Sequence, residues 1–378
     1  MAVKRPPFTV GIEEEYLLVD RHTRDLVAKP DPEMWEGLRE VLGPQVGPEF
    51  LKAQIEVGTK VSKTLDECRQ DLARLRTDLS AVVSEFDAAI IASSTHPFAQ
   101  WWDQQTTDDA RYEQLATDFQ QVARRLVICG MHVHVGIDDP DLRIDLMNQV
   151  RYFLPHILAL TTSSPFWTGR ETGLRCYRLS VFQTLPRTGM PEEFSSWSEY
   201  ERHVAVLVDA GLIEDATKLW WDIRPSTRYP TLEMRVADIC TRLDDGIAVA
   251  ALYMSLLEML FRLRTENRRW RTYAPMLIDE NMWRAQRYGV QGSLIDFGKG
   301  ELVEFRDLVE ELLILTEADA RMLGVTDALS HIRTIAKEGT SAHRQLAVFH
   351  QAIEEGASHR EALEAVVDHL IIDTLTGL

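Results

Sequence analysis

Alternating hydrophobic and polar positions predict several short β-strands in the first two thirds of the chain. Residues 8–20 alternate apolar side chains with threonine and glycine before an acidic run, and residues 51–57 alternate similarly after a loop rich in glycine and proline. Residues 127–137 form a third such stretch. Because side chains at i and i+2 of a strand share a face, each strand should bury one face. Residues 219–224 and 231–236 are expected to form a hairpin or adjacent edge strands.

The hydrophobic period changes to that of an α-helix in other segments. Thr64 and Glu67 have the spacing of a capping box, and leucine and valine recur at helical spacing from there to about residue 91. Further helices are predicted over residues 109–126, from residue 140 to about 164, over 244–268 and 278–288, and over most of 301–371. The irregular segment 166–191 holds several Gly, Thr and Arg residues, which suggests a functional loop.

No internal repeat, low-complexity tract or long linker divides the chain. The pattern therefore predicts a single α+β domain over residues 1–378, in which helices cover an antiparallel sheet. Residues 8–290 carry the motifs described below, and residues 300–378 are predicted to be a helical C-terminal part.

Composition narrows the classes of function. The chain has 378 residues and a formal charge of −18. A surface this acidic repels phosphate backbones and anionic lipid, so nucleic acid and membranes are excluded as main partners. The four cysteines form no CxxC pair and the N-terminus lacks the apolar stretch of a signal peptide, which predicts a cytoplasmic protein with reduced thiols. The most apolar stretch, residues 247–261, is too short to span a bilayer, and we expect a buried helix there.

Five predicted strands carry pairs of polar residues at spacing two. The pairs are Glu13 and Glu15, Gln54 and Glu56, His132 and His134, Asp222 and Arg224, and Glu233 and Arg235. The positions between and beside most of these pairs are apolar. If the strands join in one antiparallel sheet, one face packs under helices while the other gathers carboxylates, imidazoles and guanidiniums.

A sheet with one solvated face would show the same alternation. A wet face would, however, also favour Thr, Lys and Ser, whereas these positions hold the residue types that bind metals and phosphates. His132 and His134 are unusual as solvent residues within the apolar run 129–137, although either could instead be a core histidine whose hydrogen bonds are satisfied.

The polar set suggests a particular chemistry. Carboxylates with one or two imidazoles and no thiolate suit Mg²⁺ or Mn²⁺, and neighbouring arginines suit a polyanion such as a nucleoside triphosphate. Divalent metals held between carboxylates and phosphates are an arrangement for phosphoryl transfer. The sequence contains neither GxxxxGK[ST] nor a strand-borne GxGxxG. An ATP site would therefore have to be built on the sheet itself.

Several motifs, in the same order along the chain, resemble those of one enzyme family. They are residues 10–16 (VGIEEEY), 129–136 (CGMHVHVG), 169–178, 232–235 (LEMR) and 280–284 (ENMWR). Together they resemble the type 2 glutamate–cysteine ligase family of ATP-dependent carboxylate–amine ligases, which is similar in fold to glutamine synthetase. The resemblance implies an antiparallel sheet curved into a half-funnel, with ATP entering from one end and the acceptor amino acid from the other.

The resemblance also implies roles for individual residues. The implied ligands of two or three Mg²⁺ ions are Glu13, Glu15, Glu56, His132 and Glu233. Arg235 would contact the transferred phosphate, and His134 would lie near the nucleotide. Arg170 and Arg178 are candidates to hold the substrate carboxylate or the phosphoryl oxygens, and Gln54 belongs to a strand similar to a Gln-x-Glu strand of glutamine synthetase, which makes it a third candidate substrate-binding residue.

Asn281 and Arg284 match the last motif, but no chemical role follows from their residue types. A helix that packs against the edge of the sheet would explain them as well as a binding role would. Both readings stay open at the level of sequence.

The function implied is an ATP-dependent ligase that forms an amide, a γ-glutamyl bond by default, through an acyl phosphate, with glutamate–cysteine ligase activity as the expected reaction, even if weak. The substrates would be ATP, an amino-acid carboxylate and an amine. Two rivals are a metal-dependent amidohydrolase, because His-x-His on a strand also binds Zn²⁺, and a non-catalytic relative that binds Mg-ATP. The helical tail could dock on its own sheet or on another subunit, so a homo-oligomer stays open.

Overall fold

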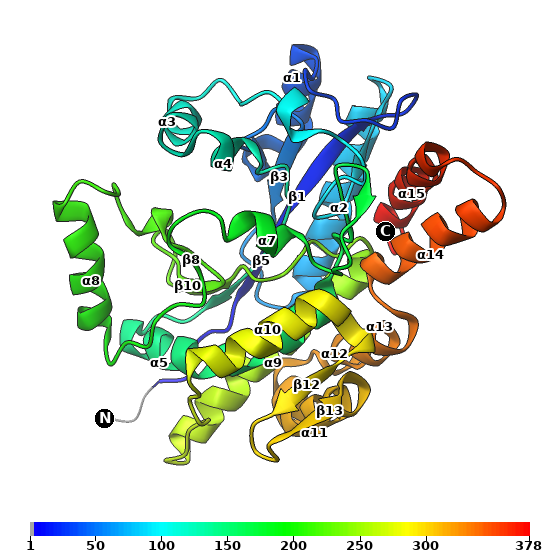
Figure 1. Ribbon diagram of the computed structural model, residues 1–378. Helices are drawn as coiled ribbons and strands as arrows, with labels where there is room; N and C mark the ends of the chain where they lie inside the picture. Colours follow the sequence, from blue (N-terminus) through cyan, green and yellow to red (C-terminus); the bar gives the residue numbers. More distant parts are fainter. Residues whose placement is uncertain (1–3) are drawn as a thin grey trace.

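A curved antiparallel sheet of seven strands forms the centre of the computed structural model, which describes residues 4–378 (Figure 1). The strands lie in the order β10-β11-β5-β1-β3-β2, and β4 pairs with the C-terminal half of β1. Their bounds are β1 Val10–Asp20, β2 Val46–Pro48, β3 Gln54–Gly58, β4 Ala88–Ile91, β5 Met131–Gly136, β10 Ile223–Pro225 and β11 Thr231–Met234. The predicted sheet and the hairpin between β10 and β11 are confirmed.

Strand β1 shows why the sheet has an apolar and a polar face. Val10, Ile12 and Tyr16 are fully buried, whereas Glu13 and Glu15, which point to the opposite face, are only partly covered. The apolar face packs under two long helices, α2 (Leu65–Ser84) and α9 (Leu243–Thr265). The alternation along β1 thus decides which face is left for chemistry.

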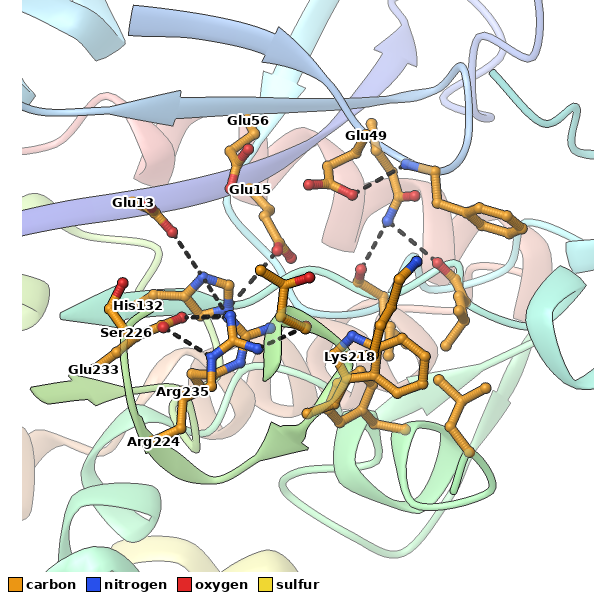
Figure 2. Close-up of a pocket in the computed structure, with 18 of the residues that line it drawn as sticks. Glu13, Glu15, Glu49, Glu56, His132, Lys218, Arg224, Ser226, Glu233 and Arg235 are labelled. Atoms are coloured by element: carbon orange, nitrogen blue, oxygen red, sulfur yellow. Dashed lines mark hydrogen bonds and ion pairs between the residues drawn. The ribbon is translucent and has the colours of Figure 1, made fainter. Parts of the chain in front are cut away.

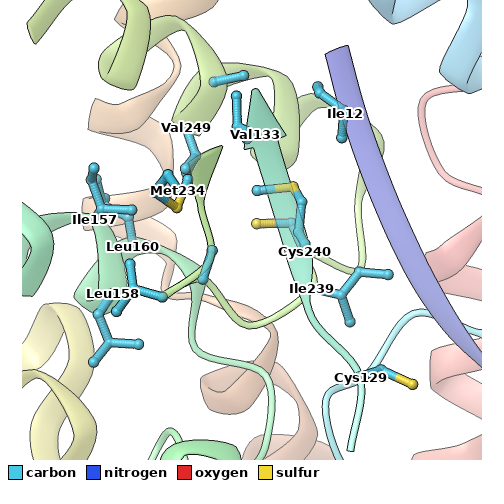
Figure 3. Packing of buried hydrophobic residues seen from close by; sticks show 14 of the residues in the cluster. Ile12, Cys129, Val133, Ile157, Leu158, Leu160, Met234, Ile239, Cys240 and Val249 are labelled. Atoms are coloured by element: carbon cyan, nitrogen blue, oxygen red, sulfur yellow. The ribbon is translucent and has the colours of Figure 1, made fainter. Parts of the chain in front are cut away.

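Helix α9 runs through the core. Its 23 residues are long and apolar enough to cross a membrane. The expectation that the apolar stretch here is too short to span a bilayer was therefore wrong. Within the molecule, however, 94% of its most apolar window is buried, as the sequence predicted for a core helix. Figure 3 shows how Val249 of α9 lies near Met234 of β11 and Val133 of β5 in the hydrophobic cluster beneath the sheet.

The remaining helices surround the sheet and form most of the C-terminal part (Figure 1). They are α1 Pro32–Leu42, α3 Ala110–Phe119, α4 Gln121–Arg124, α5 Pro140–Val150, α6 Leu154–Thr161, α7 Arg178–Phe182, α8 Trp197–Asp209, α10 Pro275–Tyr288, α11 Phe305–Leu323, α12 Thr326–Ser330, α13 Ile332–Glu338, α14 Ser341–Glu354 and α15 His359–Thr374. Single 3₁₀ turns occur at Gly43–Gln45, Trp101–Asp103, Arg151–Phe153, Ala216–Lys218 and Gly289–Gln291. Three small two-stranded sheets pair β6 (Phe166–Trp167) with β7 (Arg170–Glu171), β8 (Thr188–Gly189) with β9 (Trp220–Trp221), and β12 (Ser293–Asp296) with β13 (Glu301–Glu304).

Some predicted boundaries were wrong for identifiable reasons. The helix expected to reach residue 91 ends at Ser84, the chain reverses at Asp87, which has a φ of 53°, and residues 88–91 form β4. These four residues are buried on both sides, and such a short apolar run fits a helix or a strand equally well. The helix predicted over 109–126 is divided at Gln120, whose φ is 51°.

Several elements were not predicted, among them α1, α8 and the β12–β13 hairpin. Helix α1 begins with an Asp31 cap and a proline in its first turn, a signal that the glycine- and proline-rich composition of the segment concealed. The β12–β13 hairpin includes residues 301–304, so the part expected to be entirely helical begins with a strand.

Candidate active site

A cavity of about 290 Å³ lies on the polar face of the sheet. Strand register brings the predicted ligands together there: Glu13 lies opposite His132 and Glu15 opposite Glu56. Glu233 lies opposite His134 in the same way. Figure 2 shows the side chains of Glu13, Glu15, Glu56, His132 and Glu233 converging on this space from four neighbouring strands.

The two histidines are held in orientations that leave one ring nitrogen for a ligand. His132 Nδ1 lies 3.1 Å from Glu13 Oε2, and His134 Nδ1 lies 3.0 Å from the Oγ1 atom of Thr231. Both Nε2 atoms are buried and have no hydrogen-bond partner within residues 4–378. Burial lowers the pKa of His132 to about 4, so this imidazole is neutral at pH 7. A neutral imidazole whose other nitrogen is fixed by a neighbour is the usual form of a metal-binding histidine.

Three overlapping groups of side chains could each hold a cation, because their ligand atoms lie within 4.8 Å of one another. The groups are Glu13, His134 and Glu233; Glu13, Glu56 and His132; and Glu15, Glu49 and Glu56. The oxygen-rich sets with at most one imidazole fit Mg²⁺ or Mn²⁺. Glu13 takes part in two groups, which places it between two adjacent cation positions.

Glu49 was missed by the sequence analysis. It lies in the loop after β2, where no alternation marks it, and its Oε2 atom accepts a hydrogen bond from the backbone N–H of Phe50 at 3.0 Å. Burial raises the pKa of Glu15 to about 7, and repulsion from Glu49 adds to this rise. Burial and Glu49 also raise the pKa of Glu56. Carboxylates this close to one another need cations to stay ionised together.

Two arginines hold Glu233 from opposite sides. The Nε atom of Arg224 donates to Oε2 at 2.9 Å, and Arg235 donates to Oε1. Burial acts to raise the pKa of Glu233, but the charges of Arg235 and Arg224 outweigh burial and lower it. The Nε atom of Arg235 is buried without a hydrogen-bond partner within the described chain, so this guanidinium still has a donor for an oxyanion.

Arg224 lines the cavity, although no role was predicted for it beyond its spacing-two pair with Asp222. Its spacing-two partner Asp222 does not line the cavity, contrary to the expectation for that pair, because it lies buried at the junction between β9 and β10. Burial raises the pKa of Asp222 to about 7. The backbone carbonyl of Asp222 accepts hydrogen bonds from Arg235 and Val236, so this residue ties β10 to the end of β11.

The predicted substrate-binding residues have different surroundings. Arg178 lines the cavity and is buried, with its Nη atoms 3.2 and 3.4 Å from the carbonyls of Arg235 and Val236. Gln54 also lines the cavity, but its amide is bonded to backbone: it donates to the carbonyl of Ile128 at 2.7 Å and accepts from Leu51. We infer that Gln54 shapes the wall of the site.

Arg170 does not line the cavity. It follows the turn at Thr168 and Gly169, both with positive φ, and this turn leaves the side chain of Arg170 exposed at the end of the β6–β7 hairpin. The structure therefore gives no support to a substrate-binding role for Arg170.

Asn281 and Arg284 hold the β12–β13 hairpin against α10. The side chain of Asn281 exchanges two hydrogen bonds with the backbone of Ile295, at 2.9 and 2.7 Å, and Arg284 donates to the carbonyl of Ser293 at 2.6 Å. Of the two readings open for these residues, the structure favours packing.

Solved structures share this fold. The glutamate–cysteine ligase of Francisella tularensis, solved in complex with AMP, aligns with a TM-score of 0.70 over 100% of this chain and 90% of its own, at 15% identity. A bifunctional glutathione synthetase from Pasteurella multocida aligns with a TM-score of 0.70 over 97% of this chain and 52% of its own, also at 15% identity. At 15% identity these likenesses show a shared fold.

The model of glutamate-cysteine ligase family 2 matches residues 9–369, and the chain belongs to this family. A relative from Rhodospirillum rubrum, named "Putative glutamate--cysteine ligase 2", is 60% identical over all of this chain and 98% of its own length. A relative of the same name from a Jannaschia species is 51% identical over 97% of this chain and 96% of its own length. This membership shows an ATP-dependent ligase that forms carbon–nitrogen bonds. The family, the fold and the class of enzyme predicted from the sequence are confirmed.

Proposed function

We propose that the enzyme phosphorylates the γ-carboxylate of glutamate with ATP and joins it to an amine, with cysteine as the reference acceptor that the relatives' names supply. The observation that carries this proposal is the set of three overlapping groups of carboxylates and histidines, each able to hold a cation, beside the paired arginines. Glu13, Glu15, Glu49, Glu56, His132, His134 and Glu233 would hold two or three Mg²⁺ ions there. When bound, such ions neutralise charge on a triphosphate and on the carboxylate that approaches it.

The first step forms an acyl phosphate. A carboxylate oxygen of glutamate attacks the γ-phosphorus of ATP, and the bond from that phosphorus to the ADP oxygen breaks. Arg235, whose Nε is unpartnered within the described residues, and Arg178, which lines the cavity, would donate to the oxygens of the phosphoryl group during transfer. Removal of one preorganised donor of this kind costs about 3–4 kcal/mol of barrier in other enzymes.

The second step forms the amide. The amine nitrogen attacks the acyl carbon, the carbon–oxygen bond to phosphate breaks, and inorganic phosphate leaves with the electron pair. The nitrogen loses a proton, which a carboxylate of the cavity accepts. The products are the γ-glutamyl amide, ADP and phosphate in equal amounts.

Hydroxylamine offers a direct test, because it captures acyl phosphates as hydroxamates. The protein with glutamate, ATP, Mg²⁺ and hydroxylamine should form hydroxamate and ADP in a 1:1 ratio, and EDTA should stop both. Hydrolysis of amides without ADP formation would instead indicate the amidohydrolase. Binding of Mg-ATP without any hydroxamate would indicate the non-catalytic relative, and either result overturns the proposal.

A further inference from the structure

The cavity has two chemically different ends. Glu13, His132, Glu233, Arg224 and Arg235 lie at one end, and Glu49 and Lys218 lie at the other, with Glu15 and Glu56 between them (Figure 2). The walls near Glu49 and Lys218 are largely apolar. Phe50 directly follows Glu49 in the chain, Tyr112 packs on Phe50, and Trp220 is two residues from Lys218. Leu115, Phe182 and Leu185 also line the cavity. Phosphate oxygens and metal ions gain nothing from contact with apolar walls, so this end is suited to an apolar part of a substrate.

The apolar walls are held in place by contacts outside the cavity. The rings of Phe50 and Tyr112 meet edge to face with centroids 5.8 Å apart, and Tyr112 donates a hydrogen bond to the carbonyl of Pro48 at 3.2 Å. Trp220 packs edge to face against Phe119 of α3 at 5.9 Å. These contacts join three separate segments around the space, so it is a preformed pocket that need not collapse when no ligand is present.

Lys218 lies at this end, and among residues 4–378 its ion pair with Glu214 is a weak one. The Nζ atom of Lys218 lies 3.7 Å from a carboxylate oxygen of Glu214, whose side chain is 70% exposed, while Lys218 itself is 17% exposed. A pair of this kind contributes little and can be exchanged for a better one. The backbone around Lys218 is fixed, because Arg224 donates to the carbonyls of Thr217 and Leu219 at 2.9 and 2.8 Å. The side chain of Lys218 lines the cavity, where its ammonium group can pair with a substrate carboxylate.

We propose that this end binds the amine substrate and that this substrate is an apolar α-amino acid larger than cysteine. Its side chain would lie against Phe50, Leu115 and Trp220, its carboxylate would pair with Lys218, and its nitrogen would face the acyl carbon beside Glu15 and Glu56. The inference rests on the proposed function, and the bonds formed and broken are those of the amide-forming step above. The side chain of cysteine, one methylene and a thiol, would leave most of the apolar wall in contact with water.

The test compares specificity constants for different amines at saturating glutamate and Mg-ATP. L-Leucine and L-phenylalanine should exceed L-cysteine by about 10-fold or more in kcat/KM, the range that one or two buried methylenes give. L-Phenylalanine should exceed phenethylamine, which lacks the carboxylate. The proposal is overturned if kcat/KM is higher for cysteine than for both apolar amino acids. It is also overturned if kcat/KM for phenethylamine equals that for phenylalanine.

Two variants examine the named contacts. Leu115→Ser should lower kcat/KM for leucine and phenylalanine by about 10-fold and leave that for cysteine almost unchanged. Lys218→Met should lower kcat/KM for phenylalanine to the value for phenethylamine, because the carboxylate of phenylalanine then has no cation to pair with. Leu212→Ser serves as the matched control, because Leu212 is 63% exposed and lies outside the cavity. Equal losses for all amines in either variant would contradict the proposal.

Hydroxylamine separates this inference from the function on which it rests. It is too small to reach the apolar wall or Lys218, so hydroxamate formation by the unaltered protein, with Leu212→Ser as its control, reports the proposed function alone. If the unaltered protein forms hydroxamate but shows no preference for apolar amino acids as the amine, only the inference about the amine is contradicted. No hydroxamate at all removes the proposed function and the inference together.

Discussion

Glu13 and Glu233 show how much of the site depends on single carboxylates. Glu13 lies within reach of both histidines, at 3.1 Å from His132 and 3.5 Å from His134. Burial acts to raise the pKa of Glu13, but its interactions with the two histidines outweigh burial and lower it. Glu233 is held ionised by two arginines instead. Each carboxylate is thus kept as an anion by a different set of neighbours.

Replacement of Glu233 by glutamine should remove a metal ligand with little change of shape. We expect hydroxamate formation to fall roughly 100-fold or more, as for other losses of a preorganised charge at a reacting centre. Circular dichroism should show a folded protein. Glu354→Gln, a change on the exposed face of α14, is the control and should keep full activity. Full activity in Glu233→Gln would remove the assignment of Glu233 as a ligand.

A buried ion pair supports the opposite face of β1. Arg76 of α2 and Glu14 are both fully buried, and Arg76 donates to both oxygens of Glu14 at 2.6 and 2.9 Å. It also donates to the carbonyls of Thr241, Cys240 and Thr374. One guanidinium therefore joins the central strand, the segment before α9 and the last helix.

Arg76→Met should lower the free energy of unfolding by about 3–5 kcal/mol, because it leaves the Glu14 carboxylate buried without its cation. Arg74→Met is the matched control: Arg74 lies on the same helix and pairs with Asp71, but it is 39% exposed, so a change below about 1 kcal/mol is expected. Urea unfolding measures both. Equal effects in the two variants would show that the buried pair contributes no more than a surface pair.

At the scale of elements, the alternation in β1, β5 and β11 was readable from the sequence because each of these strands has one apolar and one polar face. That pattern was enough to bring most of the predicted ligands to one face. It could not find β4, which is buried on both sides, or Glu49 and Lys218, which lie in a loop and a 3₁₀ turn. It also could not show that Gln54 is bound to backbone, because the segment that bonds it lies about seventy residues away.

The segment after β4 contains a histidine that couples the fold to pH. His96 is buried, its Nδ1 accepts hydrogen bonds from the N–H groups of Phe98 and Ala99 at 3.2 and 2.9 Å, and its Nε2 therefore donates to the carbonyl of Arg24 at 2.9 Å. Burial lowers the pKa of His96 to about 3. A proton on Nδ1 would break both accepted bonds, so the folded state holds the neutral ring.

Because the folded pKa lies below the unfolded value of about 6.5, this contribution to stability is complete above pH 6.5 and is lost as the pH falls toward 3. Between pH 6.5 and 5 the loss from His96 should be about 2 kcal/mol. His96→Gln should be less stable at pH 7 and should lose less on acidification, as measured by urea unfolding at both values. His22→Gln, at an exposed turn, should behave as the unaltered protein does, and an unchanged pH slope in His96→Gln would contradict this account.

At the scale of the whole molecule, the charge of −18 has two meanings. It disfavours nucleic acid and anionic membranes as partners, yet several of the carboxylates gather in one cavity where they can hold cations. The ligands come from residues 13 to 233, so the chain must fold around the site before the site exists. The residue types predicted the chemistry of this cavity, whereas its apolar end became visible only when distant segments were brought together.

The most direct test of the central claim follows the oxygen of the donor carboxylate. Glutamate labelled with ¹⁸O in its γ-carboxylate is incubated with the protein, ATP, Mg²⁺ and L-leucine, with cysteine in a parallel reaction, and the released phosphate is examined by ³¹P NMR. Phosphoryl transfer to the carboxylate, followed by attack of the amine, predicts one ¹⁸O atom in each phosphate. Amide formation that releases unlabelled phosphate would contradict the acyl phosphate and with it the proposed mechanism.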